Sequence, residues 1–246
     1  TRPPLGRMLV VDRSGSRQAE DKMVFAREGR PRLVGELHPA DLVGITAFDD
    51  RAEVILPMTS VGEGERIHGA IDQLIPRGGT NLSEGIRVGY EGLDRMEGTG
   101  VMRRVLLLTD AMANVGDTDL HRIAHQARAG DARGISLSAV GVGLAHEDAV
   151  LAEMARQGQG NHYFLDSPQR ITRVFEREVQ GLLEDVADQA HLTFSPAAGV
   201  EVVRVEGVDV ETTSGEHWRM DLGRVGAGQH RVALITLRGV DPRASA

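Results

Sequence analysis

Short apolar runs alternate with longer amphipathic segments over the first three quarters of the chain. Continuous apolar runs are typical of strands that are covered on both faces of a parallel sheet. They predict strands at 8–11, 42–48, 52–56, 104–110, 135–142 and 161–165. The segments between them have helical apolar spacing, at 18–37, 64–75, 82–96, 117–129, 147–156 and 168–187. This alternation predicts an α/β fold with a doubly wound, mostly parallel sheet flanked by helices.

One strand is expected to run against the others. Asp49 and Asp50 form a tight turn between the strands predicted at 42–48 and 52–56, and so short a link joins antiparallel neighbours. The segment 52–56 is therefore expected to be an antiparallel strand at the edge of the sheet.

The rhythm changes after residue 187. Short strands joined by Gly, Pro and Ser turns are predicted at 191–194, 200–205, 217–222 and 230–237, with no helix between them. We therefore expect a first domain over 1–187 and a small, all-β, sandwich-like unit over 188–246, with Trp218 in its core. A unit of this size is small for independent stability. The chain begins at Thr1 and not at methionine, so we expect a fragment whose upstream segment packs with the C-terminal β unit.

Composition narrows the classes of function. The chain has 246 residues, of which 41% are hydrophobic and 26% charged, a balance that is typical of globular proteins. A net charge of -8 gives no support to a nucleic-acid partner, and no apolar run is long enough to span a membrane. The absence of cysteine excludes disulfides and thiolate chemistry. Lys22 is the only lysine among 28 basic residues, a usage that indicates a bacterial source.

Candidate ligands for a metal ion follow the first strand. Asp12, Ser14 and Ser16 stand at alternate positions, with Gly15 allowing the chain to turn. Carboxylate and hydroxyl oxygens suit a hard cation such as Mg²⁺, although the same five residues are also compatible with an ordinary turn. Asp110 likewise ends a buried strand, and carboxyl ends of parallel strands share one edge of a sheet. Thr80, in a Gly-Gly loop that opens a helix, is placed at the same edge.

The order of these groups resembles the von Willebrand factor type A domain, in particular its bacterial branch with a β-rich extension. The resemblance rests on Asp12-x-Ser14-x-Ser16, on 79–82 (Gly-Thr-Asn-Leu), and on Thr109-Asp110 before 113–116 (Ala-Asn-Val-Gly). It implies a metal-ion-dependent adhesion site in which Asp12, Ser14, Ser16, Thr80 and Asp110 hold Mg²⁺, or Mn²⁺ or Ca²⁺. A partner protein with an exposed Asp or Glu completes the metal shell in that family, and the resemblance implies binding and no enzymatic activity.

The same resemblance places a partner-binding rim beside the metal, made of Arg17, Gly79, Met112 and Asn114. Two positions near the site depart from the family pattern. Arg17 replaces a frequent methionine, and Ala111 replaces a common glycine. A third departure is Pro31, which is expected to kink the first helix. None of the three removes a ligand.

Other readings of these residues are weaker. Gly141-Val142-Gly143 lacks the third glycine of a dinucleotide site, and His121 with His125 lacks the glutamate of a zinc protease, so a solvated helix face is expected there. Two alternatives keep the fold. One is a subunit of a metal-chelatase-like machine linked to an AAA+ ATPase, and the other is a scaffold that binds no metal.

Overall fold

A computed structural model describes residues 4–15, 27, 35, 37–96, 100–110, 112–142, 148–165, 170, 173–174, 177–178, 185–197, 199–214, 217–226 and 232–239. The chain divides into two compact units, Thr1–Gln180 and Gly181–Ala246. The sequence placed this boundary a few residues later, after residue 187.

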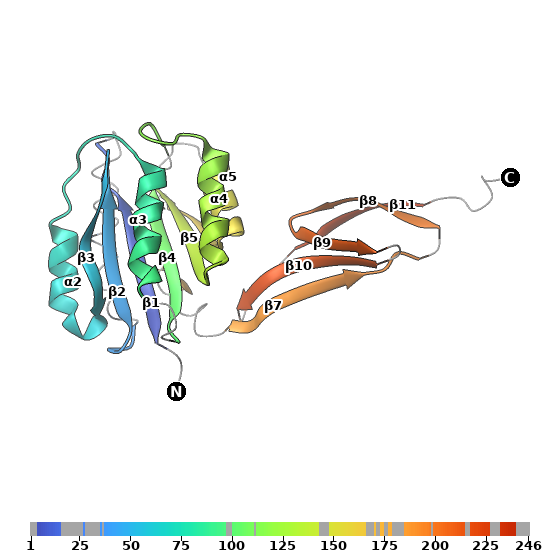
Figure 1. Cartoon of the computed structure of the whole chain (residues 1–246), viewed down its shortest axis with the longest axis horizontal. Helices are drawn as coiled ribbons and strands as arrows, with labels where there is room; N and C mark the ends of the chain where they lie inside the picture. Colours follow the sequence, from blue (N-terminus) through green and yellow to red (C-terminus); the bar gives the residue numbers. More distant parts are fainter. Residues whose placement is uncertain are drawn as a thin grey trace. The chain divides into compact units, whose positions relative to one another are not determined.

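The first unit is built on one six-stranded sheet with the order β3-β2-β1-β4-β5-β6 (Figure 1). All neighbouring strands are parallel except β3, which runs antiparallel to β2 at the edge. The predicted doubly wound, mostly parallel sheet with one antiparallel edge strand is thereby confirmed. The strands are β1 (Leu5–Asp12), β2 (Leu42–Phe48), β3 (Ala52–Ser60), β4 (Met102–Thr109), β5 (Ile135–Val142) and β6 (Gln159–Leu165).

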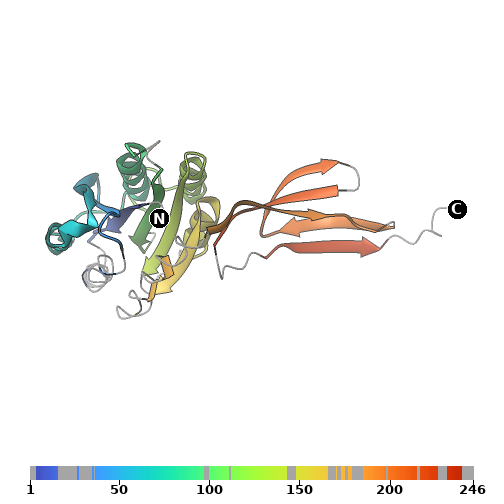
Figure 2. The same cartoon turned by 90° about the horizontal axis from the view of Figure 1, so that it is seen from below.

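Helices α3 (Leu82–Asp94), α4 (Leu120–Asp131) and α5 (Asp148–Gln157) cover one face of this sheet, as both views show (Figures 1 and 2). A short helical turn, Val61–Glu63, and α2 (Gly64–Asp72) follow the edge strand β3. The α3 and α4 helices begin where side chains accept backbone N–H groups, at Asn81 and Asp119 respectively. Alternate strand residues such as Met8 and Val10 are fully buried in the core below α3.

Helix α3 lies unusually close to the sheet because glycines face it. A Cβ atom added at Gly89 would lie 2.4 Å from Val10 Cγ2, and one added at Gly85 would lie 2.5 Å from a ring carbon of Phe48. No side chain larger than hydrogen fits there without displacing the strands. The close approach fixes the start of α3, and with it the loop that carries Thr80.

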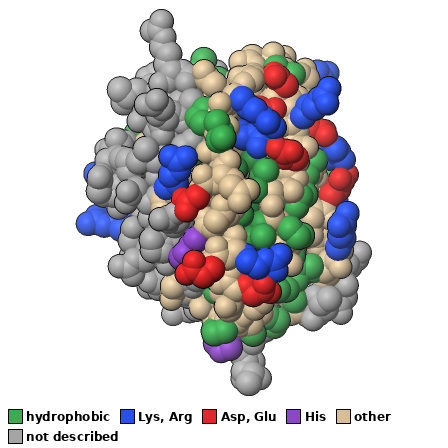
Figure 3. Space-filling view, turned by 90° about the vertical axis from the view of Figure 1, so that its left-hand side faces the viewer, with side chains coloured by type: hydrophobic (Ala, Val, Ile, Leu, Met, Phe, Trp, Pro, Cys, Tyr) green, Lys and Arg blue, Asp and Glu red, His purple; other side chains and the backbone are tan. Residues whose placement is uncertain are grey.

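The edge strand β3 is longer than predicted. It continues past Pro57 to Ser60, whereas the sequence prediction ended it at Leu56. Proline lacks a backbone N–H, but an edge strand tolerates this because one of its sides is unpaired. Seen from this side, hydrophobic side chains form a band between charged ones (Figure 3). Val54 is 46% exposed there.

Two predicted helices differ from the structure. The helix predicted at 64–75 ends at Asp72. The prediction that the last helix of the first domain, at 168–187, reaches Ala187 is wrong. Strand β7 begins at Asp185, and Asp185 and Ala187 pair with β10. Strand pairing overrides local helical spacing here. Most of the helix predicted at 18–37, including Pro31, lies outside the described residues.

The second unit contains only strands among its described residues. These form a three-stranded sheet, β7-β10-β9, and a two-stranded sheet, β11-β8, all antiparallel. On β10, Met220 is fully buried and Trp218, two residues earlier, is half-buried. The strands are β7 (Asp185–Phe194), β8 (Val200–Glu206), β9 (Asp209–Ser214), β10 (His217–Gly226) and β11 (Leu234–Gly239). Strand β9 was not predicted.

Candidate functional site

The candidate ligands gather at the carboxyl edge of the sheet because β1 and β4 are neighbours. Asp12 is the last residue of β1, and Asp110 directly follows β4. The two strands pair in parallel, with Val11 opposite Leu108. Both carboxylates therefore leave the sheet at the same edge, as the sequence predicted.

The carboxylate of Asp12 is held through both of its oxygen atoms. The backbone N–H of Ser14 donates to Oδ1 at 2.8 Å, and the hydroxyl of Thr109 donates to Oδ2 at 2.7 Å. Asp110 accepts a longer hydrogen bond of 3.3 Å from the backbone N–H of Met112. Thr109 thus links the two acidic loops, a role that sequence reasoning missed although the residue directly precedes Asp110.

Thr80 is fixed by the loop that follows β4. Its backbone N–H donates to Asn114 Oδ1 at 2.8 Å, and its carbonyl accepts the N–H groups of Asn114 at 3.1 Å and Val115 at 3.3 Å. Gly79 permits this contact, because an added Cβ would lie 2.6 Å from Val115 Cγ2. Asn114, predicted as a rim residue, therefore also positions Thr80.

The loop after β1 is joined to the Thr80 loop by backbone hydrogen bonds. Gly15 N–H donates to the carbonyl of Gly78 at 3.0 Å, and Arg77 N–H donates to the carbonyl of Arg13 at 2.8 Å. Gly78 has φ +66, a left-handed conformation that favours glycine. All three ligand-bearing loops are therefore tied to one another before any ligand binds.

An ion-pair network lies beside these loops, and sequence reasoning did not find it. Asp49 Oδ2 accepts Arg13 Nε at 2.8 Å and Arg77 Nε at 2.7 Å, and both arginines also contact Glu53. Burial acts to raise the pKa of Asp49, but hydrogen bonds from Arg77, Arg13 and the Arg51 backbone hold it below its ordinary value. Arg13 stands between two candidate ligands in sequence, so this network anchors their loop.

The described candidate ligands are buried. The exposed fractions of Asp12, Ser14, Thr80 and Asp110 are 0, 1, 2 and 3%. The predicted rim residue Met112 is 51% exposed, and Asn114 is also exposed. Ser16, Arg17 and Ala111 lie outside the described residues.

The donor set fits a hard divalent cation. Its side chains offer only carboxylate and hydroxyl oxygens, the ligand type that Mg²⁺ and Ca²⁺ prefer. The two histidines considered for zinc, His121 and His125, lie exposed on α4. Within the described residues no helix is both long and apolar enough to cross a membrane.

Comparison with known proteins identifies the family. The family model of the von Willebrand factor type A domain matches residues 8–177. The uncharacterized protein YfbK of Escherichia coli (strain K12) is 29% identical over 245 residues, which cover 96% of this chain and 42% of YfbK. The uncharacterized protein sll0103 of Synechocystis is 27% identical over 96% of this chain and 57% of its own length. The chain thus spans about half the length of these relatives.

Solved structures share the fold. A von Willebrand factor type A protein from Catenulispora acidiphila superposes with a TM-score of 0.73 at 19% identity, over 98% of this chain and 59% of that one. Proximal thread matrix protein 1 from the mussel byssus, solved with a zinc-occupied adhesion motif, gives a TM-score of 0.59 at 19% identity, over 77% of this chain and 49% of that one. The chain belongs to the von Willebrand factor type A domain family, whose members typically bind proteins.

Proposed function

We propose that the chain is a non-enzymatic protein-binding module that uses a divalent cation to capture an acidic residue of a partner. Asp12, Ser14, Thr80 and Asp110, together with Ser16, would hold the cation, with Mg²⁺ as the expected ion. The observation that carries the proposal is the burial of the four described oxygen donors on loops that hydrogen bonds join. A bound cation would neutralise the negative charge of the buried carboxylates of Asp12 and Asp110 and so stabilise this arrangement.

The loop network supports binding of a cation without large rearrangement. Ser14 N–H and the Thr109 hydroxyl orient Asp12, and Asn114 orients the Thr80 loop, so the positions of these donors are set in advance. The cation would supply the charge that attracts a carboxylate of the partner. The exposed Met112 and Asn114 would lie against the partner around that contact.

A similar site in a structural relative supports the choice of a metal. The mussel protein was solved with zinc in its adhesion motif, and another similar structure is a pilus adhesin from Lactobacillus rhamnosus GG. Adhesion through a metal-bound carboxylate is therefore the function we propose for this chain. We propose further that strands outside this chain complete its C-terminal β unit.

Calorimetric titration with Mg²⁺ and Mn²⁺, with parallel melting curves, tests the metal site. Saturation at a hundred times the dissociation constant is expected to stabilise the fold by about 2.7 kcal/mol. Asp12→Asn is expected to abolish this gain, while Asp94→Asn, which removes a surface ion pair with Arg133, leaves it intact. Equal melting of the wild type with and without metal would instead support the metal-free scaffold.

Partner capture needs a separate probe. Titration of the chain with a Gly-Gly-Asp-Gly-Gly peptide, followed by NMR, is expected to shift signals near Met112 and Asn114 in Mg²⁺ but not in EDTA. The Gly-Gly-Asn-Gly-Gly peptide is the matched control and is expected to give no shifts. Identical shifts with both peptides would contradict carboxylate capture.

A further inference from the structure

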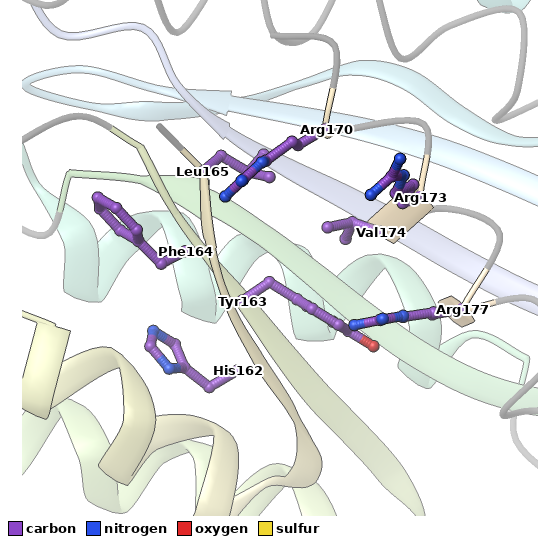
Figure 4. Close-up of a pocket in the computed structure, with 8 residues that line it drawn as sticks. All are labelled: His162, Tyr163, Phe164, Leu165, Arg170, Arg173, Val174 and Arg177. Carbon is purple, nitrogen blue, oxygen red and sulfur yellow. The ribbon is translucent and has the colours of Figure 1, made fainter. Parts of the chain in front are cut away.

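A polar pocket, separate from the candidate cation site, lies in the first unit on the edge strand β6. Its volume is about 330 Å³, within the range of small-molecule sites. Three of its lining residues are arginines from one short stretch of chain: Arg170, Arg173 and Arg177. In Figure 4 these arginines approach from one side, and His162 and Phe164 of β6 approach from the other. Among the described residues that line the pocket there are three arginines and no acidic side chain.

Two of these arginines, Arg173 and Arg177, make no described contact that would compensate their charge. Within the described residues and their contacts, no hydrogen bond or ion pair involves the guanidinium groups of Arg173 and Arg177, and both residues are exposed. Arginines on protein surfaces commonly lie beside a carboxylate, as Arg87 lies beside Glu84 on α3. Arg173 and Arg177 instead face the pocket.

The wall behind the pocket adds buried charge. Arg7 of β1 and Arg104 of β4 are opposite each other in the strand pairing, and they are 2 and 3% exposed. Arg104 pairs with Glu178 at 3.1 Å and donates to Ser136 Oγ at 2.8 Å. Tyr163, which lines the pocket, donates from its hydroxyl to Glu178 Oε1 at 2.8 Å. Tyr163 therefore connects the pocket to the buried arginines.

Arg7 is held by charge and packing alone. None of its Nε, Nη1 and Nη2 atoms has a hydrogen-bond partner. Burial lowers the pKa of Arg7 to about 10, although Glu178 opposes the shift. The second nearby carboxylate, Asp41, accepts the backbone N–H groups of Leu5 and His38. Glu178 and Asp41 thus act on Arg7 through their charge and not through a hydrogen bond, while Glu178 also pairs with Arg104.

We propose that this pocket binds a multivalent phosphate anion of the pyrophosphate type, either free or as part of a nucleotide. Guanidinium groups form paired hydrogen bonds with phosphate oxygens, and several of them together favour an anion with more than one charge. A single carboxylate would neutralise only a fraction of the charge lining the pocket. Phe164, which is 43% exposed at the pocket, offers a ring face for the base of a nucleotide.

This anion site is independent of the proposed cation site. The described cation ligands lie at the ends of β1 and β4 and in the Thr80 loop, and none of them lines the pocket. Titrations in EDTA therefore test the anion site alone. Failure of one proposal leaves the other standing.

Calorimetric titration of the full chain with sodium pyrophosphate in EDTA is the test. We expect saturable binding that weakens as the salt concentration rises, because charge drives the interaction. The double variant Arg173→Gln and Arg177→Gln is expected to bind at least tenfold more weakly. Both side chains are exposed, so an unchanged melting temperature is expected to show that the variant folds.

A variant of equal charge separates a local site from general attraction. Arg66→Gln with Arg122→Gln removes two exposed arginines from α2 and α4, and pyrophosphate affinity is expected to stay within about twofold of the wild type. Absence of binding at millimolar pyrophosphate, or equal weakening in both double variants, would overturn the proposal. Tighter binding of ADP that is lost in Phe164→Ala would identify a nucleotide, and equal binding of ADP and pyrophosphate would identify the inorganic anion.

Discussion

Two groups of buried charges on the same sheet differ in sign and in the contacts that stabilise them. At the carboxyl edge, Asp12 and Asp110 are acidic, and neutral N–H and O–H donors hold them. In the sheet interior, Arg7 and Arg104 are basic, and only Arg104 has a carboxylate partner. The first group lies where hydrogen-bonded loops leave the carboxyl edge of the sheet, whereas the second lies on adjacent strands behind a pocket.

The difference shows where each charge is balanced. A buried charge is tolerated when it is paired, hydrogen-bonded or neutralised by a ligand. The acidic group has ordered donors around it and suits a bound cation, while in the basic group Arg104 pairs with Glu178 and the Arg7 guanidinium makes no hydrogen bond.

Removing the carboxylate of Glu178 is expected to have the largest effect. Glu178→Gln leaves the buried Arg104 without its ion-pair partner and removes a favourable charge near Arg7, and we expect a loss of about 3–5 kcal/mol in the free energy of unfolding. Urea denaturation measures this loss. Glu153→Gln, which breaks an exposed pair with Arg156, is the control and should change stability by less than about 1 kcal/mol.

The same residue predicts a dependence on pH. Burial acts to raise the pKa of Glu178, but Arg104 and hydrogen bonds from Asn161 and Tyr163 hold it below the ordinary value of 4.5. Below that pH the unfolded chain takes up a proton that the folded chain does not. Stability is therefore expected to fall with decreasing pH, by up to about 1.4 kcal/mol per pH unit from this group. Denaturation curves between pH 7 and 3 should show a shallower decline in Glu178→Gln.

Weakening the network beside the acidic loops is expected to have an intermediate effect. Asp49→Asn removes the anion between Arg13 and Arg77, and we expect a loss of about 2 kcal/mol because Arg13 is buried. The affinity for Mg²⁺ should fall with it, since Arg13 belongs to the ligand loop. Glu63→Gln, in an exposed pair with Arg66, should cost less than about 0.5 kcal/mol. Unchanged Mg²⁺ affinity in Asp49→Asn would show that the ion-pair network does not position the cation ligands.

Removing the buried guanidinium group of Arg7 is expected to stabilise the chain. Arg7→Met deletes a buried charge that makes no hydrogen bond, and a gain of about 1–2 kcal/mol is expected in urea denaturation. Arg104→Met, directly opposite on β4, should instead destabilise, because it leaves Glu178 unpaired. Loss of stability in both variants would show that the charges of Glu178 and Asp41 make the buried Arg7 net favourable.

The fold was predictable from sequence where the signal is local. Apolar runs located the parallel strands, and strand 135–142 was predicted with the bounds that the structure shows. Strand β9 was missed because Asp209–Ser214 has one apolar residue, so no apolar pattern marks it. The segment is a strand because its backbone pairs with β10. Pro57 suggested an early end to β3, and only the edge position of that strand explains why the strand continues.

The candidate site was predictable only in part, for the same reason. Asp12, Thr80 and Asp110 follow strands or open a helix, so topology alone placed them at one edge. The partners that hold the loops come from distant positions, such as Asp49 for Arg13, and no spacing in the sequence indicates them. Arg7 and Arg104 likewise resemble polar strand ends in the sequence, and their burial depends on Glu178 from another segment.

The position of Trp218 allows the unfolding of the two units to be followed by two different spectroscopic signals. Trp218 is the one tryptophan in the sequence and lies on β10 of the second unit, whereas every helix that the structure describes belongs to the first. Indole fluorescence therefore reports on the β unit, and far-ultraviolet circular dichroism at helical wavelengths reports on the domain with the proposed sites. Non-coincident transitions of the two signals would show that the units unfold separately, without any label.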